Sequence, residues 1–370
     1  MPWDLLKNVA TAVNKISDIA AETPINPQNF HHQILNQNKN PKYPIGELTL
    51  PVKDIYLACS KFSDSVYGPT SDQIIKSPNN LSEKKLTQNI AAKYLTNDEN
   101  TCSAIVPDNQ DHQDQFFDFG SYQDTYSGSS SNSKFSYLVN KDQKYMIISF
   151  RGTDNLQNWM KNVEISSMKM KFGQFENCSV HKGFGQIFEV LQKKIVQVIK
   201  KYHDGKDKNL KTVIFTGHSL GGALANLNYV RFSNWLPNIK FECITFGAPR
   251  VGDQNFEKAF QFVNKKFKNG NNLTKFGRFV YKDDIVPTMP NLAVNSLFDM
   301  ALNSTLAGSV PGAGASQPSA PGAAGYVHVV NSQHLDGNVI REKSFNMKIT
   351  GAVEDHKIGN YLDAIEKLYG

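Results

Sequence analysis

Residues 212–227 read Thr-Val-Ile-Phe-Thr-Gly-His-Ser-Leu-Gly-Gly-Ala-Leu-Ala-Asn-Leu. The first part is apolar and β-branched, which favours a strand, and the last part is rich in Ala and Leu, which favours a helix. Between them lies the G-x-S-x-G motif Gly217-His218-Ser219-Leu220-Gly221. A serine on such a strand-to-helix turn has its hydroxyl at the edge of a sheet, beside a helix N-terminus that favours negative charge. The motif therefore predicts that Ser219 is a nucleophile.

Strand and helix patterns alternate on both sides of this motif. Short apolar runs predict strands at 145–150, 213–216, 241–246, 276–281 and 326–330. Amphipathic runs predict helices at 54–66, 181–202, 220–235, 253–267 and 360–369. This alternation is typical of an α/β fold with a mostly parallel central sheet and helices on both faces.

Changes in composition suggest the domain boundaries. Residues 1–47 read as an N-terminal extension, with an amphipathic helix at 3–20 followed by a linker rich in Pro, Asn and Gln. We expect that helix to dock on the main domain or to be weakly ordered, and an interfacial membrane helix is the alternative. Residues 48–370 are expected to form the main domain. Within it, 291–324 is an insert with a Gly/Ala/Pro/Ser tract that contains few large apolar side chains.

Composition also narrows the partners and the location. No apolar run reaches the roughly 18 residues of a membrane span, and the N-terminus lacks the pattern of a secretory signal. A cytoplasmic or peripheral membrane location is therefore favoured. The four cysteines form no C-x-x-C pair, so no zinc or redox motif is expected. The net charge of +6 slightly favours an anionic membrane surface and is too small to predict nucleic-acid binding.

A nucleophilic serine needs a base, and the base needs an orienting acid. In α/β-hydrolases the chain order is Ser, then Asp or Glu, then His. After Ser219, both Asp283 and Asp284 lie just beyond the strand predicted at 276–281. Spacing does not choose between these two carboxylates.

Three histidines follow the acidic pair: His328 in a strand pattern, His334 in a polar turn and His356 in a charged run. A strand position suits a buried structural histidine, whereas a charged loop before the last helix suits an exposed general base. The pattern favours His356 as the base and leaves His328 and His334 as alternatives.

Seven short motifs run in order through residues 145–360. They are Phe150-Arg151-Gly152-Thr153, Val180-His181-Lys182-Gly183-Phe184, Thr216 to Ala225, Phe246 to Gly252, Asp284-Ile285-Val286-Pro287, Gly325 to Val329 and Asp355-His356. Together they resemble the class 3 lipase family, the fungal triacylglycerol lipase type of α/β-hydrolase. The resemblance implies the α/β-hydrolase fold for most of the main domain.

The resemblance also implies roles for individual residues. The acid of the family directly precedes a hydrophobic-Val-Pro sequence, which points to Asp284 rather than Asp283. Its histidine lies in the terminal Asp-His pair, which points to His356. Its oxyanion hole corresponds to the backbone N–H groups of Thr153 and Leu220. No metal or organic cofactor is implied.

The family places a lid after the oxyanion loop. In this chain Leu156, Trp159, Met160 and Val163 form an apolar stripe at helical spacing in that stretch. We expect a short lid helix that covers the serine in water and turns its apolar face toward lipid. A helix fixed in the core is the alternative.

Residues and resemblance together predict a serine carboxylester hydrolase that cleaves acyl esters of glycerolipids through an acyl-enzyme. The expected catalytic triad is Ser219, Asp284 and His356. The expected partner is lipid at a membrane or droplet surface, with transient contact to that surface. The alternatives are a lipase-like signalling or scaffold protein without turnover, against which the filled triad positions argue, and an esterase for soluble esters, against which the apolar stripe argues. The insert at 291–324 departs from the family pattern beside the acid, and the sequence assigns it no role.

Overall fold

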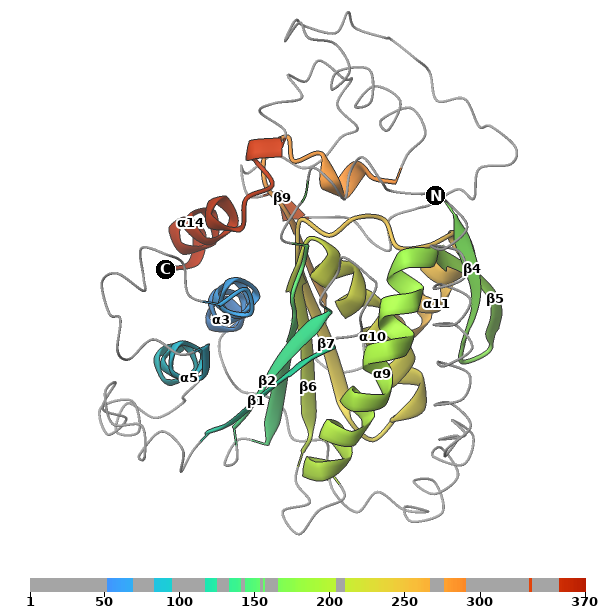
Figure 1. The fold of residues 1–370 in the computed structure, drawn as a ribbon, viewed down its shortest axis with the longest axis horizontal. Helices are drawn as coiled ribbons and strands as arrows, with labels where there is room; N and C mark the ends of the chain where they lie inside the picture. The colour runs from blue at the N-terminus through green and yellow to red at the C-terminus, as the bar shows by residue number, and fades with distance from the viewer. Residues whose placement is uncertain are drawn as a thin grey trace, which may run out of the picture.

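The computed structural model describes residues 52–68, 83–94, 117–124, 133–140, 144–153, 156, 166–203, 210–266, 276–290, 333–334 and 353–370. A seven-stranded sheet lies between two layers of helices (Figure 1). The predicted α/β class, with a mostly parallel sheet and helices on both faces, is confirmed. The arrangement is that of an α/β-hydrolase fold.

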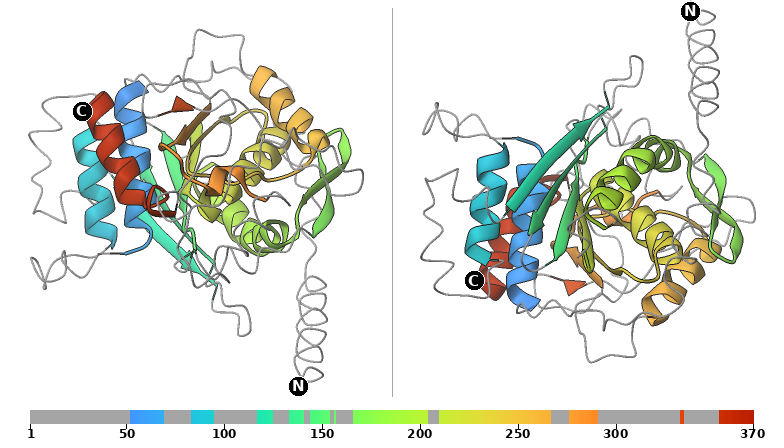
Figure 2. Two further views of the ribbon diagram at one scale, coloured as in Figure 1. Left: turned by 90° about the horizontal axis from the view of Figure 1, so that it is seen from above. Right: turned by 90° about the horizontal axis from the view of Figure 1, so that it is seen from below.

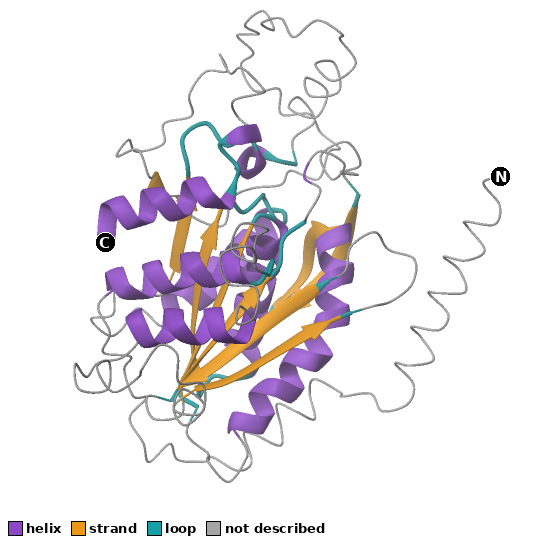
Figure 3. Ribbon diagram, turned by 60° about the vertical axis from the view of Figure 1, so that its left-hand side comes forward, coloured by secondary structure: helices purple, strands orange, loops and turns teal. Residues whose placement is uncertain are grey.

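The strands of the main sheet lie side by side in the order in which they occur along the chain. Their order is β1 (Phe117–Gln123), β2 (Lys134–Asn140), β3 (Tyr145–Phe150), β6 (Thr212–His218), β7 (Lys240–Phe246), β8 (Phe276–Val280) and β9 (Gln333–His334). The pairs among β1, β2 and β3 are antiparallel, and the pairs from β3 to β9 are parallel. Because parallel strands end at the same edge, the loops after β3, β6, β7 and β8 gather there (Figure 3).

Two groups of helices cover the sheet. On one face α3 (Val52–Ser65), α5 (Glu83–Tyr94) and α14 (Ile358–Tyr369) lie side by side, so the first and last described helices are neighbours (Figure 2). The other face is covered by α9 (Lys182–His203), α10 (Leu220–Trp235) and α11 (Gln254–Lys266).

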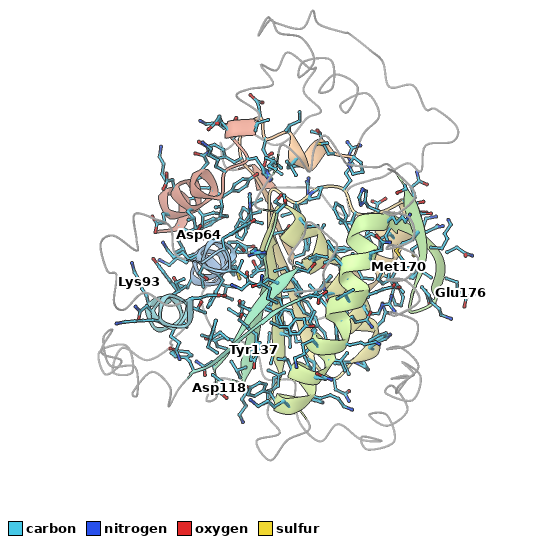
Figure 4. All side chains as sticks on the ribbon, viewed as in Figure 1. Asp64, Lys93, Asp118, Tyr137, Met170 and Glu176 are labelled. Atoms are coloured by element: carbon cyan, nitrogen blue, oxygen red, sulfur yellow. The ribbon has the colours of Figure 1, made fainter. Side chains whose placement is uncertain are left out.

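A separate hairpin of β4 (Ser167–Phe172) and β5 (Phe175–His181) packs beside α11, away from the main sheet. Met170 on β4 is buried, whereas Glu176 on β5 faces solvent (Figure 4). The hairpin therefore has one apolar face toward α11 and one polar face toward water.

Strand alternation divides the apolar side chains between two cores. On β6, Val213 and Phe215 pack in the core under α9 and α10, whereas Ile214 packs in the core under α3 and α14. A strand buried on both faces has a continuous apolar sequence, which is what residues 212–216 show. The sheet thereby holds the end of β6 rigidly from both sides.

The predicted elements that fall within the described residues are present, with small differences at their ends. The strand predicted at 326–330, the extension at 1–47 and the insert at 291–324 lie outside the described residues, so the proposed domain boundaries stay a prediction. The structure adds α5, β1, β2, β4, β5, β9 and a 3-10 helix at Val286–Thr288, which the sequence patterns did not predict. The expectation that His334 lies in a polar turn was wrong, because this residue is part of β9. Among the described helices, none combines the length and the apolar character needed to cross a lipid bilayer.

We expect Phe215→Ala to lower the free energy of unfolding by about 3–5 kcal/mol because it leaves a cavity in the core. The Phe215 ring centroid lies 6.1, 5.7 and 5.7 Å from those of Phe150, Phe232 and Phe241. Urea unfolding followed by circular dichroism measures the change. Phe262→Ala is the matched control because Phe262 is 40% exposed, and its loss is expected to stay below about 1 kcal/mol. Equal losses would contradict the central place of Phe215 in this core.

Candidate active site

Ser219 lies in a strained turn between β6 and α10. Its backbone has φ 58° and ψ −129°, a conformation that side-chain-bearing residues rarely adopt. The Ser219 N–H donates to the carbonyl oxygen of Phe246 at 3.0 Å, which ties the turn to the end of β7. The strand-to-helix turn predicted from the motif is present.

Backbone contacts explain the two glycines of the motif. A Cβ atom on Gly221 would lie 2.1 Å from the carbonyl oxygen of Phe150, and one on Gly217 would lie 2.4 Å from the carbonyl carbon of Gly221. Both distances are shorter than any real Cβ contact. The helix can therefore start this close to β3 and β6 only because neither position carries a side chain.

His356 and Asp284 form a buried hydrogen-bonded pair. His356 Nδ1–H donates to Asp284 Oδ2 at 2.7 Å, and each residue is 3% exposed. Two further donors reach the carboxylate: the N–H of Val286 at Oδ1, 2.9 Å away, and the hydroxyl of Tyr361 at Oδ2, 2.5 Å away. With donors on both oxygens, the carboxylate holds one orientation and presents Oδ2 to the imidazole.

The structure separates the two candidate acids. Asp284 points inward to His356, whereas Asp283 is exposed and uses its backbone N–H to contact Asp355 Oδ2 at 3.3 Å. The side chain of Asp283 makes no contact with His356. Asp284 is thus the member of the acidic pair that contacts His356, and its role as the catalytic acid stays a prediction.

The expectation that His356 is exposed was wrong. Its ring is buried and lies 4.5 Å from the ring of His218, centroid to centroid. Two of the charged residues of this run, Glu354 and Lys357, form an ion pair with both side chains about two-thirds exposed (66% and 67%). The charged neighbours therefore face water while the histidine turns inward, a separation that composition does not reveal.

One loop links the serine turn to the histidine–carboxylate pair. Phe246 accepts the hydrogen bond of Ser219, and the next residue, Gly247, has φ +57°. A Cβ atom on Gly247 would lie 2.9 Å from Asp284 Oδ2 and 3.0 Å from His356 Cε1. The loop after β7 therefore passes directly against both parts of the site, and only glycine fits there.

Two side-chain atoms in this site are buried without a partner. Ser219 Oγ and His356 Nε2 make no hydrogen bond within the described part of the chain. A buried polar atom with no partner is costly, so it is retained chiefly where function requires it. A hydroxyl and a carboxylate-oriented imidazole, each with an unpartnered atom among the described residues, are the groups that nucleophilic catalysis uses.

The structure brings the residues that precede Thr153 and Leu220 together, namely Gly152 and Ser219. A Cβ atom on Gly152, next to Thr153, would lie 3.2 Å from the Cβ of Ser219. Leu220 is the first residue of α10, and the first N–H groups of a helix have no acceptor within it. Their role as an oxyanion hole stays a prediction that this placement favours.

The lid prediction falls almost entirely outside the described residues. Leu156 is helical and half-buried. Trp159, Met160 and Val163 are outside the described residues, as is His328. Of His334 the structure describes only its backbone, in β9.

Sequence reasoning missed Tyr361 and Arg278, which both act on Asp284. Burial, together with the nearby charge of Asp284, raises the pKa of Tyr361 far above its ordinary range, so this hydroxyl stays a donor. Burial lowers the pKa of Arg278 to about 10, while the charges of Tyr361 and Asp284 act in the opposite direction. Arg278 therefore remains a cation at neutral pH. No periodicity marks either residue, because only the fold brings Tyr361 and the charge of Arg278 near the acid.

We expect Ser219→Gly to be more stable than Ser219→Ala by about 1 kcal/mol, because glycine relieves the backbone strain at φ 58°. Thermal unfolding of the two variants measures the difference, and neither carries a hydroxyl, so the comparison isolates the backbone. If the alanine variant were the more stable, the turn would not be strained at this residue.

Part of the chain is similar to known lipases and to a phospholipase. Residues 147–294 match the family described as Lipase (class 3). Relatives include a lipase of Rhizomucor miehei, 30% identical over 162 residues that cover 42% of this chain and 40% of the relative. A secreted mono- and diacylglycerol lipase of Fusarium solani is 30% identical over 155 residues, covering 40% of each chain. Phospholipase A1-II 1 of Oryza sativa is 25% identical over 164 residues, again covering 40% of each.

The matched stretch thus spans about two-fifths of the length of these relatives (40% of each). Among solved structures, lipase II from Rhizopus niveus matches with a TM-score of 0.45 and 21% identity, over 66% of this chain and 76% of that one. The family match lies over β3 to the loop after β8, which includes Ser219 and Asp284. Over residues 147–294 the chain is similar to the class 3 lipase family.

Proposed function

We propose that this protein is a serine carboxylester hydrolase that cleaves acyl esters of glycerolipids. The observation that carries the proposal is the buried hydrogen bond between His356 Nδ1 and Asp284 Oδ2, 2.7 Å long. The Nε2 atom of the same ring has no hydrogen-bond partner in the described part of the chain. The same is true of Ser219 Oγ. An imidazole whose Nδ1 is held by a carboxylate and whose Nε2 has no hydrogen-bond partner can take a proton from a hydroxyl.

In the first step, Ser219 Oγ attacks the carbonyl carbon of the ester while His356 Nε2 takes the hydroxyl proton. Asp284 holds the Nδ1–H of His356 and stabilises the imidazolium that forms. The carbonyl oxygen becomes an oxyanion, and the N–H groups of Thr153 and Leu220 donate to it. Donors of this kind contribute about 3 kcal/mol each to transition-state stability.

The remaining steps return the enzyme to its starting state. The tetrahedral intermediate breaks its bond to the glycerol oxygen, and the proton on His356 Nε2 passes to that oxygen as the alcohol leaves. An ester between the acyl group and Ser219 remains. Water then attacks this ester, His356 takes a proton from the water, and the free fatty acid leaves as the proton returns to Ser219 Oγ.

A glycerolipid substrate is proposed because the relatives' names converge on it. The relatives are named as a lipase, a mono- and diacylglycerol lipase and a phospholipase A1. All three names denote enzymes that act on acyl esters of lipids, and we propose a glycerol backbone as the common feature of these lipids. The sequence pattern of Leu156, Trp159, Met160 and Val163, which predicts an apolar helical stripe, supports transient contact with a lipid surface.

Fatty-acid release from triacylglycerol emulsions, diacylglycerol emulsions and phospholipid vesicles tests the proposal. We expect release from at least one of these glycerolipids, and its loss in Ser219→Ala with the fold intact by circular dichroism. A fluorophosphonate probe should label the wild type and leave Ser219→Ala unlabelled. Absence of both release and labelling would favour a lipase-like scaffold, and turnover confined to soluble esters would favour the esterase alternative.

Asp284→Asn is expected to lower kcat by about 10⁴-fold, because an amide no longer fixes the tautomer of His356 or stabilises its charge. Asp283→Asn is the matched control, since Asp283 is exposed and one residue away. Its kcat should stay close to that of the wild type. Initial rates on a short-chain ester measure both values, and a large loss in the control with little loss in Asp284→Asn would overturn the assignment of the acid.

A further inference from the structure

We propose that His218, held by the hydroxyl of Tyr67, is a positioning residue that fixes the main chain of His356 at the site. The inference rests on the proposed function. It adds residues that hold His356 in place without contacting the substrate. It links three distant segments: the turn after α3, the end of β6 and the turn before α14.

The two hydrogen bonds of His218 carry the inference. Its Nε2 atom lies 2.8 Å from the carbonyl oxygen of His356, and its Nδ1 atom lies 3.2 Å from the hydroxyl oxygen of Tyr67. The ring is 5% exposed, so water does not compete for either atom. His218 thus holds the backbone of the base, while Asp284 holds its side chain.

Chemistry fixes the direction of both bonds. A carbonyl oxygen only accepts, so His218 Nε2 carries the proton and donates it to His356. Burial and the neighbouring His356 lower the pKa of His218 well below its ordinary range, so the ring is neutral. Its Nδ1 atom is therefore an acceptor, and the Tyr67 hydroxyl must be the donor.

A neutral ring at this place suits the proposed mechanism. Three aromatic groups face His218: Tyr67 at a ring distance of 6.3 Å, Tyr361 at 5.7 Å and His356 at 4.5 Å. The carboxylate of Asp284 binds the Nδ1 atom of His356. A cation at His218 would repel the imidazolium that forms on His356, so a neutral donor can position the base without opposing its charge.

Tyr67 is held by the helix that precedes it. Ser63 Oγ in α3 lies 3.1 Å from Thr216 Oγ1 in β6, and Ser149 Oγ in β3 donates to the carbonyl oxygen of Phe62 at 3.0 Å. These bonds fix α3 on the sheet just before it ends. Tyr67 lies outside residues 147–294, which match the family, so the site depends on a segment beyond the matched region.

The Tyr67 hydroxyl has a second neighbour besides His218, and the experiment must distinguish the effects of losing the two contacts. A Cβ atom on Gly152 would lie 2.1 Å from the Tyr67 hydroxyl oxygen, so this hydroxyl also touches the oxyanion loop. Removing it therefore acts either through His218 or through that loop. A double-mutant cycle between Tyr67 and His218 distinguishes the two routes.

The cycle uses Tyr67→Phe, His218→Phe and the double variant, with kcat and KM measured on a soluble short-chain ester. We expect His218→Phe to lower kcat about 10- to 100-fold with KM nearly unchanged, because the base is misplaced and substrate binding is not. Tyr67→Phe should lower kcat about 3- to 10-fold in the wild type and have little effect in His218→Phe. His218→Gln places an amide donor near Nε2 and should recover most of the activity.

Tyr202→Phe is the matched control for loss of a tyrosine hydroxyl. Tyr202 lies at the end of α9, shortly before the start of β6 in the chain. Ser219 follows the end of β6, so Tyr202 lies near the opposite edge of the sheet. Its kcat should equal that of the wild type. Equal effects of Tyr67→Phe in both His218 backgrounds, or no recovery in His218→Gln, would overturn the inference.

A measurement without turnover covers the case in which His218→Phe does not fold. The ¹⁵N shifts of His218 should report a neutral ring protonated at Nε2, and Tyr67→Phe should move the Nδ1 shift. An unmoved shift would overturn the inference. Failure of the proposed function has a different signature: the wild type itself would neither release fatty acid nor react with a fluorophosphonate, whatever the shifts of His218.

Discussion

The positive φ of Ser219 is the constraint on which the rest of the site depends. A serine adopts this backbone conformation only where the surrounding structure enforces it. Here the carbonyl of Phe246 holds the N–H of Ser219, and Gly217 and Gly221 allow three backbone segments to meet. Two cores, one on each face of the sheet, keep β6 in place beneath the turn. The strain is thus stored in a part of the fold that is too well packed to relax.

Charge in the site is arranged around a single buried carboxylate. Asp284 receives hydrogen bonds from the backbone of Val286, the ring of His356 and the hydroxyl of Tyr361. The guanidinium of Arg278 adds a positive charge nearby. Such a set offsets the cost of burying a charge and also fixes its direction. A carboxylate held this firmly orients its imidazole by geometry as well as by charge.

The sequence predicted the parts of this molecule whose pattern is local. The apolar runs of β3, β6 and β7 and the amphipathic run of α9 were found because burial repeats with the period of the element. The motif at Ser219 predicted the turn because its glycines reflect contacts within the motif. The strand β4 was not predicted, although its sequence Ser-Met-Lys-Met-Lys-Phe alternates between polar and apolar residues, as is typical of a half-buried strand.

The sequence could not predict contacts that the fold alone creates. Tyr67, His218 and Tyr361 meet His356 and Asp284 from separate segments, and no spacing rule connects them. The charged run around His356 suggested an exposed loop, but a charged composition does not show which side chains of the run point inward. Here the charged neighbours point to solvent and His356 points into the protein. Asp283 and Asp284 are adjacent in sequence, and only the direction of the chain after β8 decides which carboxylate is buried. Family resemblance chose between them where spacing could not.

The pairing of α3 with α14 has a consequence for the nascent protein. On the ribosome, Tyr67 and α3 are made first, Ser219 and Asp284 next, and His356 only with the turn that leads into α14. A chain in which β6 and α10 have already folded therefore exposes a serine without its base. In the proposed mechanism that intermediate is inert, so hydrolysis is switched on by the docking of α14 against a helix made long before it. The order of synthesis would keep the proposed ester hydrolysis from starting until the fold is complete.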